Sequence, residues 1–301
     1  MGDLINPHIK LKGKLDQKDY TDINNLQKLC SELDHTTLKL ELDYKLRRAE
    51  GLNGSLKNIN EFMVYNENKL IGYIGICHFG GNAIEVNGMV HPEYRRRGIF
   101  KTLFSFVKDE WGKRESQKML LLSDNNSLSG LEFIKRSCTA NHAHSEYEMF
   151  LSGNPKQDLN LYNVVLRKAT NQDAKEIARQ NAVYFEIEYK EEDLLIPEEE
   201  EQRGTSIYLA EVDHTVIGKV HLELSDGVGG IYGLGVLPEY RKKGYGREIL
   251  ARAIEKLKER NLKDIMLQVE VKNRSALNLY SSCGFEVTST MDYFEMSKGE
   301  L

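Results

Sequence analysis

Apolar and polar positions along this chain follow two periods, and the succession of the two periods occurs twice. Short apolar runs bounded by turn residues predict strands, and longer runs with apolar residues three or four apart predict helices. In the first half the expected strands are 61–66, 70–78, 84–90, 118–123 and 146–151, with helices in 21–48, 98–114 and 127–136. In the second half the expected strands are 164–168, 206–212, 216–224, 230–236, 264–271 and 293–296, with helices in 171–184, 244–260 and 275–283. The pattern predicts two copies of one α+β fold.

One segment of eleven residues occurs in both halves in closely similar form. Residues 236–246 read VLPEYRKKGYG and residues 90–100 read VHPEYRRRGIF, so six of eleven positions are identical and two more exchange Arg for Lys. In each copy an expected strand precedes the segment and an expected helix follows it. A basic turn with glycine between a strand and a helix can bind an anion, because backbone N–H groups point outward and the helix dipole favours negative charge. The repeat therefore predicts two phosphate-binding units.

The length of 301 residues is typical of two ordinary domains. We expect these domains at 1–152 and 161–301, joined by a polar linker at 153–160. The net charge of -5 argues against general binding to nucleic acid. No apolar run approaches the ~20 residues that cross a bilayer, so no membrane partner is expected.

The cysteines and histidines change this picture little. The four cysteines are scattered without a C-x-x-C pair, which is typical of reduced thiols and, with no signal peptide in view, predicts a cytoplasmic protein. His142 and His144 are two residues apart with no third ligand nearby, so no metal is expected there.

Further residues around the second copy of the motif make its chemistry more specific. Arg241 to Gly246 (RKKGYG) follows a strand and a Pro-Glu-Tyr lead-in, and residues 273–285 (NRSALNLYSSCGF) lie downstream. With these features the chain resembles the GNAT acetyltransferase superfamily over nearly its whole length, and its arrangement resembles tandem members such as mycothiol synthase. The resemblance implies two tandem GNAT-like domains, each a mixed, mostly antiparallel sheet flanked by helices. It also implies acetyl-CoA as cosubstrate.

The residues of the motif are suited to a pyrophosphate. Gly244 and Gly246 leave room for the backbone to approach it, and the basic side chains around them supply positive charge. In the family, the strand backbone before the motif pairs with the pantetheine arm, which requires that strand to splay from its neighbour. Glycines in 229–235 make such distortion easy. Asn273 can cap the next helix at Ser275 or Ala276, while the family position contacts pantetheine. The expected coenzyme-binding residues are Leu234, Gly235, Val236, Arg241, Lys242, Lys243, Gly244, Tyr245, Gly246, Arg247, Asn273, Ala276 and Tyr280.

Acetyl transfer needs an acid for the departing thiolate and a base for the amine. Tyr280 matches the family position of the acid, and a phenol with a pKa near ~10 can serve; packing on the sheet is the alternative role. For the base we expect Glu223, with Glu270 as the alternative and His221 and Tyr232 as further candidates. The strand entering the motif carries no glutamate in the second copy.

The acceptor is expected to be a small, cationic molecule with a primary amine. Nine of the sixteen residues in 186–201 are acidic, and an acidic segment over the acceptor pocket would attract a cation; a solvated charged surface is the alternative. The sequence thus predicts an N-acetyltransferase whose C-terminal domain is catalytic. The rival hypothesis is a coenzyme-A-binding sensor without transfer activity.

The first copy departs from the motif. Phe100 replaces the final glycine and would place a ring where backbone should approach phosphate, and Phe133 stands in place of the acid-capable tyrosine. Residues 95–98 keep the basic turn. The first half is expected to be non-catalytic, and either a structural half or a retained coenzyme site.

Overall fold

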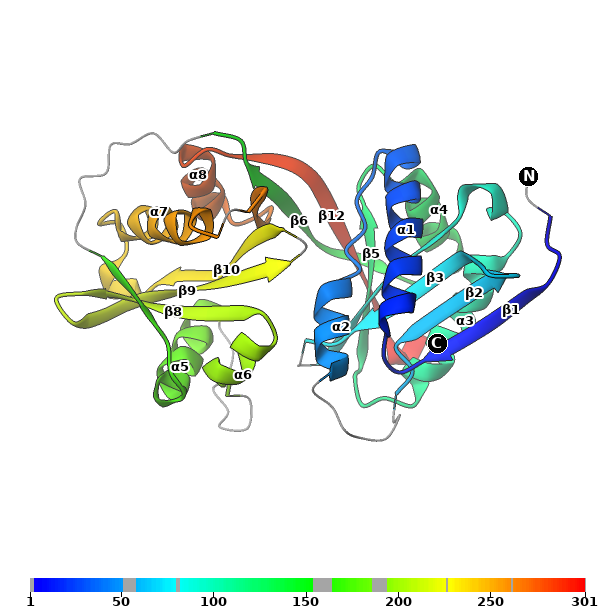
Figure 1. The fold of residues 1–301 in the computed structure, drawn as a ribbon, viewed down its shortest axis with the longest axis horizontal. Coiled ribbons are helices and arrows are strands. Elements are labelled where there is room, and N and C mark those ends of the chain that lie inside the picture. The colour runs from blue at the N-terminus through cyan, green and yellow to red at the C-terminus, as the bar shows by residue number, and fades with distance from the viewer. Residues whose placement is uncertain are drawn as a thin grey trace. The chain divides into compact units, whose positions relative to one another are not determined.

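The structure is a computed structural model that describes residues 3–50, 58–79, 82–153, 164–185, 194–225, 227–260 and 262–300. The chain forms two compact units (Figure 1). Unit 1 comprises Met1–Glu146 with Ser289–Leu301, and unit 2 comprises Tyr147–Thr288.

Unit 1 is a mixed sheet with helices on both faces. Its elements are β1 (Pro7–Lys12), α1 (Gln17–Asp34), α2 (Leu42–Glu50), β2 (Glu61–Asn66), β3 (Lys69–Cys77), β4 (Ala83–Val90), α3 (Ile99–Gly112), β5 (Lys118–Asp124) and α4 (Leu128–Ser137), with parts of β6 (Asn141–Leu151) and β12 (Phe285–Ser297). The strand order is β1-β2-β3-β4-β5-β12-β6. The β4–β5 pair is parallel, because α3 crosses over between these strands, and the pairs from β1 to β4 are antiparallel.

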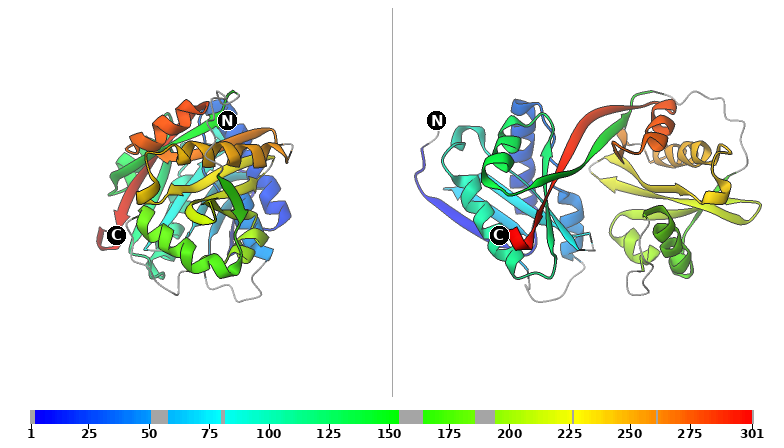
Figure 2. Two further views of the ribbon diagram at one scale, coloured as in Figure 1. Left: turned by 90° about the vertical axis from the view of Figure 1, so that its left-hand side faces the viewer. Right: turned by 180° about the vertical axis from the view of Figure 1, so that it is seen from behind.

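Alternation along β2 gives unit 1 two cores. Phe62 and Val64 pack in the apolar cluster that contains α3 residues, whereas Met63 and Tyr65 pack in the cluster that contains α1 residues. Successive side chains of a strand point to opposite faces, so α1 and α2 cover one face of this sheet and α3 and α4 the other (Figures 1 and 2).

Unit 2 repeats this plan. Its elements are β7 (Val165–Lys168), α5 (Ala174–Phe185), α6 (Pro197–Gln202), β8 (Thr205–Val212), β9 (Thr215–Ser225), β10 (Val228–Val236), α7 (Tyr245–Lys258), β11 (Asp264–Glu270) and α8 (Arg274–Ser282), with the remaining parts of β6 and β12. Ile207 and Leu209 of β8 pack on the α5 side, and Tyr208 and Ala210 on the α7 side. The two faces of this sheet are thus covered separately, as in unit 1.

The closing strands are where the structure differs from the predicted domain ranges. The chain passes from unit 1 to unit 2 within β6, after Glu146, and returns within β12, after Thr288. Residues Met291 to Ser297 of β12 pair antiparallel with β5 and so complete the sheet of unit 1. The predicted ranges 1–152 and 161–301 kept each closing strand in its own half. Both halves end on Glu-Met, and local pattern does not distinguish one such strand from the other as a partner. Most of the predicted linker 153–160 lies outside the described residues.

Most predicted elements are present with ends shifted by a few residues, and the expected α+β class is confirmed. Two differ more: β12 begins eight residues before the predicted strand 293–296, and the predicted helical region 21–48 is two helices separated at 35–41. Two elements were missed. The edge strand β1 has mostly exposed side chains, and α6 is one short turn within the acidic segment. Neither carries the apolar periodicity from which the other elements were predicted.

A buried polar cluster stabilises unit 1. The Lys45 Nζ atom lies 2.9 Å from Glu61 Oε2 and donates to the Tyr73 hydroxyl at 3.2 Å, and that hydroxyl donates to Glu61 at 2.6 Å. All three side chains are buried. Burial, and then the neighbouring Glu61 charge, hold the pKa of Tyr73 well above its usual value.

Removing the cation from this cluster is expected to be costly. Lys45→Met should lower the free energy of unfolding of unit 1 by about 3–5 kcal/mol, because Glu61 would stay buried without its ion partner. Denaturant unfolding measures the loss. The double variant Lys45→Met with Glu61→Met should recover most of it, since no unpaired charge is left; a double variant as unstable as the single one would contradict this account.

Candidate functional site

The repeated turn in unit 2 has the backbone of an anion site. Lys242 and Gly244 adopt positive φ angles of 61° and 88°, and α7 begins directly after Gly244. The Arg241 Nε atom donates to the carbonyl of Val236 at 2.9 Å, which ties the turn to the end of β10. The turn thus presents the N-terminus of a 14-residue helix beside exposed basic residues.

The turn in unit 1 is built the same way, with one difference in charge. Arg96 and Gly98 have φ angles of 64° and 80°, and Arg95 Nε donates to Val90 O at 3.0 Å. Here, however, the Arg95 guanidinium also makes two bonds to the Asp34 carboxylate, at 2.8 and 2.6 Å. One cation of the first turn is therefore already paired.

The expected splay before the motif is present. The parallel pairing of β10 with β11 ends at Ile231 opposite Leu267, so the rest of β10 has separated from β11. The register between β10 and β9 shifts between Tyr232 and Gly235, and Gly233 has a φ of 54°. Among the described strands, the backbone of 234–236 thus has a partner on one edge only. In unit 1, β4 likewise leaves β5 after Val86.

Two glycines at this splay are required by close packing. A Cβ on Gly218 would lie 2.2 Å from the carbonyl oxygen of Gly235. A Cβ on Gly235 would lie 2.2 Å from the ring of Tyr184, at the end of α5. Sequence reasoning missed Tyr184; its place at the end of the helix before the acidic segment was the only available signal.

The start of α7 and the C-terminal half of α8 lie side by side in unit 2. The Arg247 guanidinium donates to the Ser282 hydroxyl at 3.1 Å. A Cβ on Gly246 would lie 3.5 Å from Leu279, an ordinary contact, so the protein itself leaves this position open. The Asn273 side chain accepts from the backbone N–H of Ala276 at 3.1 Å, which confirms the predicted helix cap.

The three candidate catalytic residues differ in burial. Tyr280, on α8, is 8% exposed and packs edge-to-face on Phe285 with ring centres 6.3 Å apart. Burial raises the pKa of Tyr280 to about 12. Glu223 lies on β9 opposite Gly230 and is partly buried, whereas Glu270 ends β11 and is exposed.

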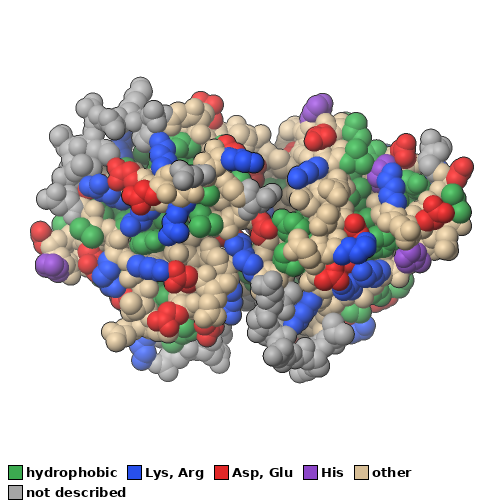
Figure 3. Space-filling view, in the orientation of Figure 1, with side chains coloured by type: hydrophobic (Ala, Val, Ile, Leu, Met, Phe, Trp, Pro, Cys, Tyr) green, Lys and Arg blue, Asp and Glu red, His purple; other side chains and the backbone are tan. Residues whose placement is uncertain are grey.

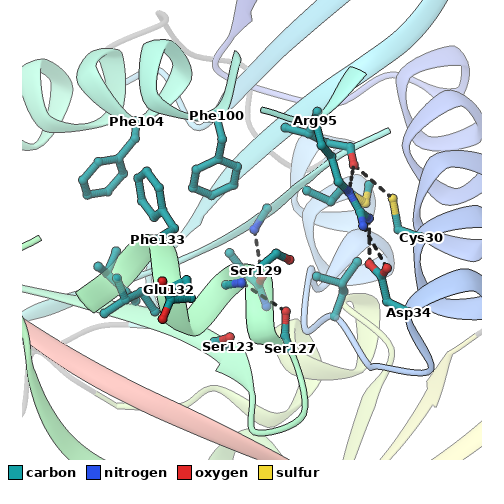
Figure 4. Close-up of a pocket in the computed structure, with 18 of the residues that line it drawn as sticks. Cys30, Asp34, Arg95, Phe100, Phe104, Ser123, Ser127, Ser129, Glu132 and Phe133 are labelled. Carbon is teal, nitrogen blue, oxygen red and sulfur yellow. Dashed lines mark hydrogen bonds and ion pairs between the residues drawn. The ribbon is translucent and has the colours of Figure 1, made fainter. Parts of the chain in front are cut away.

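Unit 1 holds a cavity of about 390 Å³ at its own motif. It is lined by the end of α1, the separated end of β4, the basic turn, the start of α3, the end of β5 and α4. Figure 4 shows the rings of Phe100 and Phe104 from α3 pointing toward Phe133 of α4. The Phe100 and Phe133 rings meet edge-to-face at 4.6 Å. The ring of Phe100 thus packs on Phe133 and lines this cavity, and its expected effect on phosphate binding stays a prediction.

One polar atom at this cavity lacks a partner. Asn87 lies on the separated part of β4 and is 7% exposed. Its Oδ1 atom accepts from the N–H of Gly88 at 2.7 Å, and its Nδ2 atom is buried with no hydrogen-bond partner among the described residues. A buried donor without an acceptor costs stability, and a ligand carbonyl in the cavity would satisfy it.

Comparison with known proteins decides the family. Residues 58–137 match the profile described as "Acetyltransferase (GNAT) domain", and residues 171–285 match that of the "Acetyltransferase (GNAT) family". The chain belongs to the GNAT acetyltransferases. It is a tandem member, with one GNAT domain in each unit.

Relatives of this tandem GNAT protein include mycothiol acetyltransferases. That of Thermobifida fusca is 40% identical over 74 residues, which are 23% of this chain and 23% of the relative, so the chain spans about a quarter of that relative's length. That of Renibacterium salmoninarum is 26% identical over 219 residues, 65% of this chain and 62% of the relative. A solved structure described as a tandem GNAT protein from the clavulanic acid biosynthesis pathway superimposes with a TM-score of 0.71 over 98% of this chain and 99% of its own, at 14% identity. This last likeness concerns the fold alone.

The acidic segment is only partly described. Residues 186–193 of this GNAT protein lie outside the described residues. In α6, Glu201 pairs with Lys168, and Glu199 and Glu200 both pair with Arg203. Much of the negative charge of α6 is therefore balanced within unit 2, as expected of a solvated surface.

The two histidines considered as metal ligands lie against aromatic rings. His142 packs on Phe294 and His144 stacks on Tyr293 at 4.2 Å, and no cluster of three metal-ligating side chains occurs in the described ranges. Acidic and basic side chains are interspersed on the face drawn in Figure 3. None of the described helices has the length and apolar character needed to cross a bilayer.

Proposed function

We propose that the second GNAT domain transfers an acetyl group from acetyl-CoA to the primary amine of a small, cationic acceptor. The observation that carries this proposal is the junction of three features at one place: the separated end of β10, the turn with Lys242 and Gly244 in the left-handed region, and the start of α7. The name of the relatives, mycothiol acetyltransferase, supports acetyl transfer.

The residues of this junction fit the coenzyme in a definite way. Backbone N–H groups around Gly244 and the side chains of Lys243 and Arg247 would hold the pyrophosphate. The free edge of 234–236 would bond to the pantetheine amides as a strand does. Tyr280 is protonated at neutral pH, because the ordinary pKa of a phenol is near ~10 and burial raises that of Tyr280 to about 12, so its phenol can give a proton to the departing thiolate.

A panel of amines tests the proposal. The purified full-length chain is mixed with acetyl-CoA and each amine, and thiol release is followed. We expect release with small cationic amines, with a rate that falls as salt rises, because screening weakens attraction to the acidic segment. Equal rates with neutral and cationic amines would contradict the proposed preference for a cationic acceptor. No release with any amine, together with measurable coenzyme binding, would favour the rival, a sensor without transfer activity.

The cavity in unit 1 favours a second coenzyme site as well. It lies at the first copy of the motif, and its lining includes Asn87, whose Nδ2 atom has no hydrogen-bond partner among the described residues. We expect isothermal titration with acetyl-CoA to give two sites per chain. Asn87→Ala should weaken one site and leave the other unchanged. A single site that is insensitive to Asn87 would mean that unit 1 serves a structural role.

A further inference from the structure

A lysine is buried in the sheet of unit 2 at the splay. Lys219, on β9, is 0% exposed. Its Nζ atom lies 3.1 Å from His221 Nε2 and donates to the carbonyl of Gly233 at 3.1 Å. The ring of Tyr184 lies 5.6 Å away. Within the described ranges this amine has no carboxylate partner, which is unusual because a buried ammonium is normally paired.

The position of this pair along the sheet relates it to the reacting group. Across from β9, Lys219 faces Gly235 and His221 faces Tyr232, both beyond the point where β10 has separated from β11. Glu223 faces Gly230, where the sheet is still closed. If the thioester lies along 234–236, the Lys219–His221 pair is closer to it than Glu223 is.

We propose that His221 accepts the proton of the acceptor amine and passes its other ring proton to Lys219. This inference rests on the proposed acetyl transfer and names the base for it. His221 is partly exposed and can meet the amine, whereas Lys219 acts through His221 and positions its ring. The first unit has Tyr73 and Gly75 at the matching positions, so the pair is confined to the second unit.

The protons balance in the following way. The acceptor nitrogen bonds to the thioester carbon as the C–S bond breaks. His221 Nδ1 takes the proton from that nitrogen, and the proton on Nε2 moves to Lys219 Nζ, which becomes an ammonium that still donates to Gly233. The departing thiolate takes the proton of Tyr280, and exchange with solvent restores both groups.

Burial prepares the pair for this transfer. It lowers the pKa of Lys219 to about 7, and burial together with the Lys219 charge holds the pKa of His221 well below its usual value. Other titratable groups face the pair from its own strand and neighbours: Glu223 on β9, Tyr232 on β10 and Tyr184 on α5, while the facing β8 residues Ile207 and Leu209 are apolar. Lys219 is neutral above about pH 7, so the transfer rate should rise with pH through that value.

The test compares pH profiles of kcat/KM for four proteins with one active amine from the panel. We call the rise of kcat/KM with pH near pH 7 the limb of the profile. His221→Gln should lower kcat/KM about 100-fold and remove this limb. Lys219→Met should lower the rate and move the limb to lower pH, because His221 then titrates alone. Glu223→Gln should keep the limb. Lys263→Met, on the exposed surface of the same unit, should match the wild type. The acceptor's own titration is common to all and cancels in each ratio.

The outcomes separate this inference from the function beneath it. Coenzyme affinity by titration calorimetry shows that each variant retains its folded site. If the wild type transfers and His221→Gln keeps both its rate and its limb, the pair is not the base; loss of the limb in Glu223→Gln instead would assign the base to Glu223. If the wild type transfers to no amine, the proposed function falls and this inference with it.

Discussion

Tyr280→Phe should lower kcat by about 10²–10⁴ while the dissociation constant for acetyl-CoA stays nearly the same. The phenol is buried against Phe285, and removal of one oxygen leaves that packing in place. The raised pKa makes Tyr280 a weak acid, but the same apolar surroundings raise the basicity of a thiolate beside it. The difference in pKa between the Tyr280 phenol and the departing thiol therefore stays small, as efficient proton transfer requires.

The matched control is Tyr208→Phe, which removes a phenolic oxygen from the same core, at a residue whose ring lies under Lys256. It should keep wild-type turnover. Stopped-flow or steady-state thiol release with the best amine measures both variants. Unchanged turnover in Tyr280→Phe would leave Tyr280 with a packing role alone.

Gly218→Ala should weaken acetyl-CoA binding to the second unit by at least about tenfold and cost about 1–3 kcal/mol of stability. The added Cβ would lie 2.2 Å from Gly235 O and 3.3 Å from Val236 Cα. Both atoms belong to backbone that cannot rotate aside, so the separated end of β10 must shift. That shift moves the edge that is proposed to bind pantetheine.

Gly153→Ala, in the same unit and outside the expected coenzyme-binding residues, is the control for this effect. Its Cβ would meet nothing within 4 Å. We expect wild-type affinity or nearly so. Calorimetry on both variants also assigns heats to sites, because Gly218→Ala should leave any site in unit 1 intact. If Gly218→Ala binds with wild-type affinity at the second unit, the 234–236 edge does not hold the coenzyme.

The candidate site was predictable where its residues are near in sequence. The turn from Arg241 to Gly246 and the cap at Asn273 depend on contacts within a few positions, and both stand as predicted in the structure. Tyr184 could not be assigned to the site, because its contact with Gly235 joins α5 to β10. The Lys219–His221 pair was only partly predictable. An i, i+2 spacing on a strand puts both residues on one face, but the pattern shows neither the burial of Lys219 nor its contact with the Gly233 carbonyl.

By itself the sequence determined that two copies of one α+β unit follow each other, where their helices and strands lie, and that each unit has a basic turn before a helix. These properties follow from periodicity and turn chemistry, which act over a few residues. Only the tertiary structure decided that β12 returns to pair with β5, that Phe100 packs on Phe133 and lines a cavity with Asn87, and that Lys219 is buried beside His221. Each of these depends on which distant strand or helix packs alongside, and two strands of similar pattern are equally acceptable partners until the whole sheet forms.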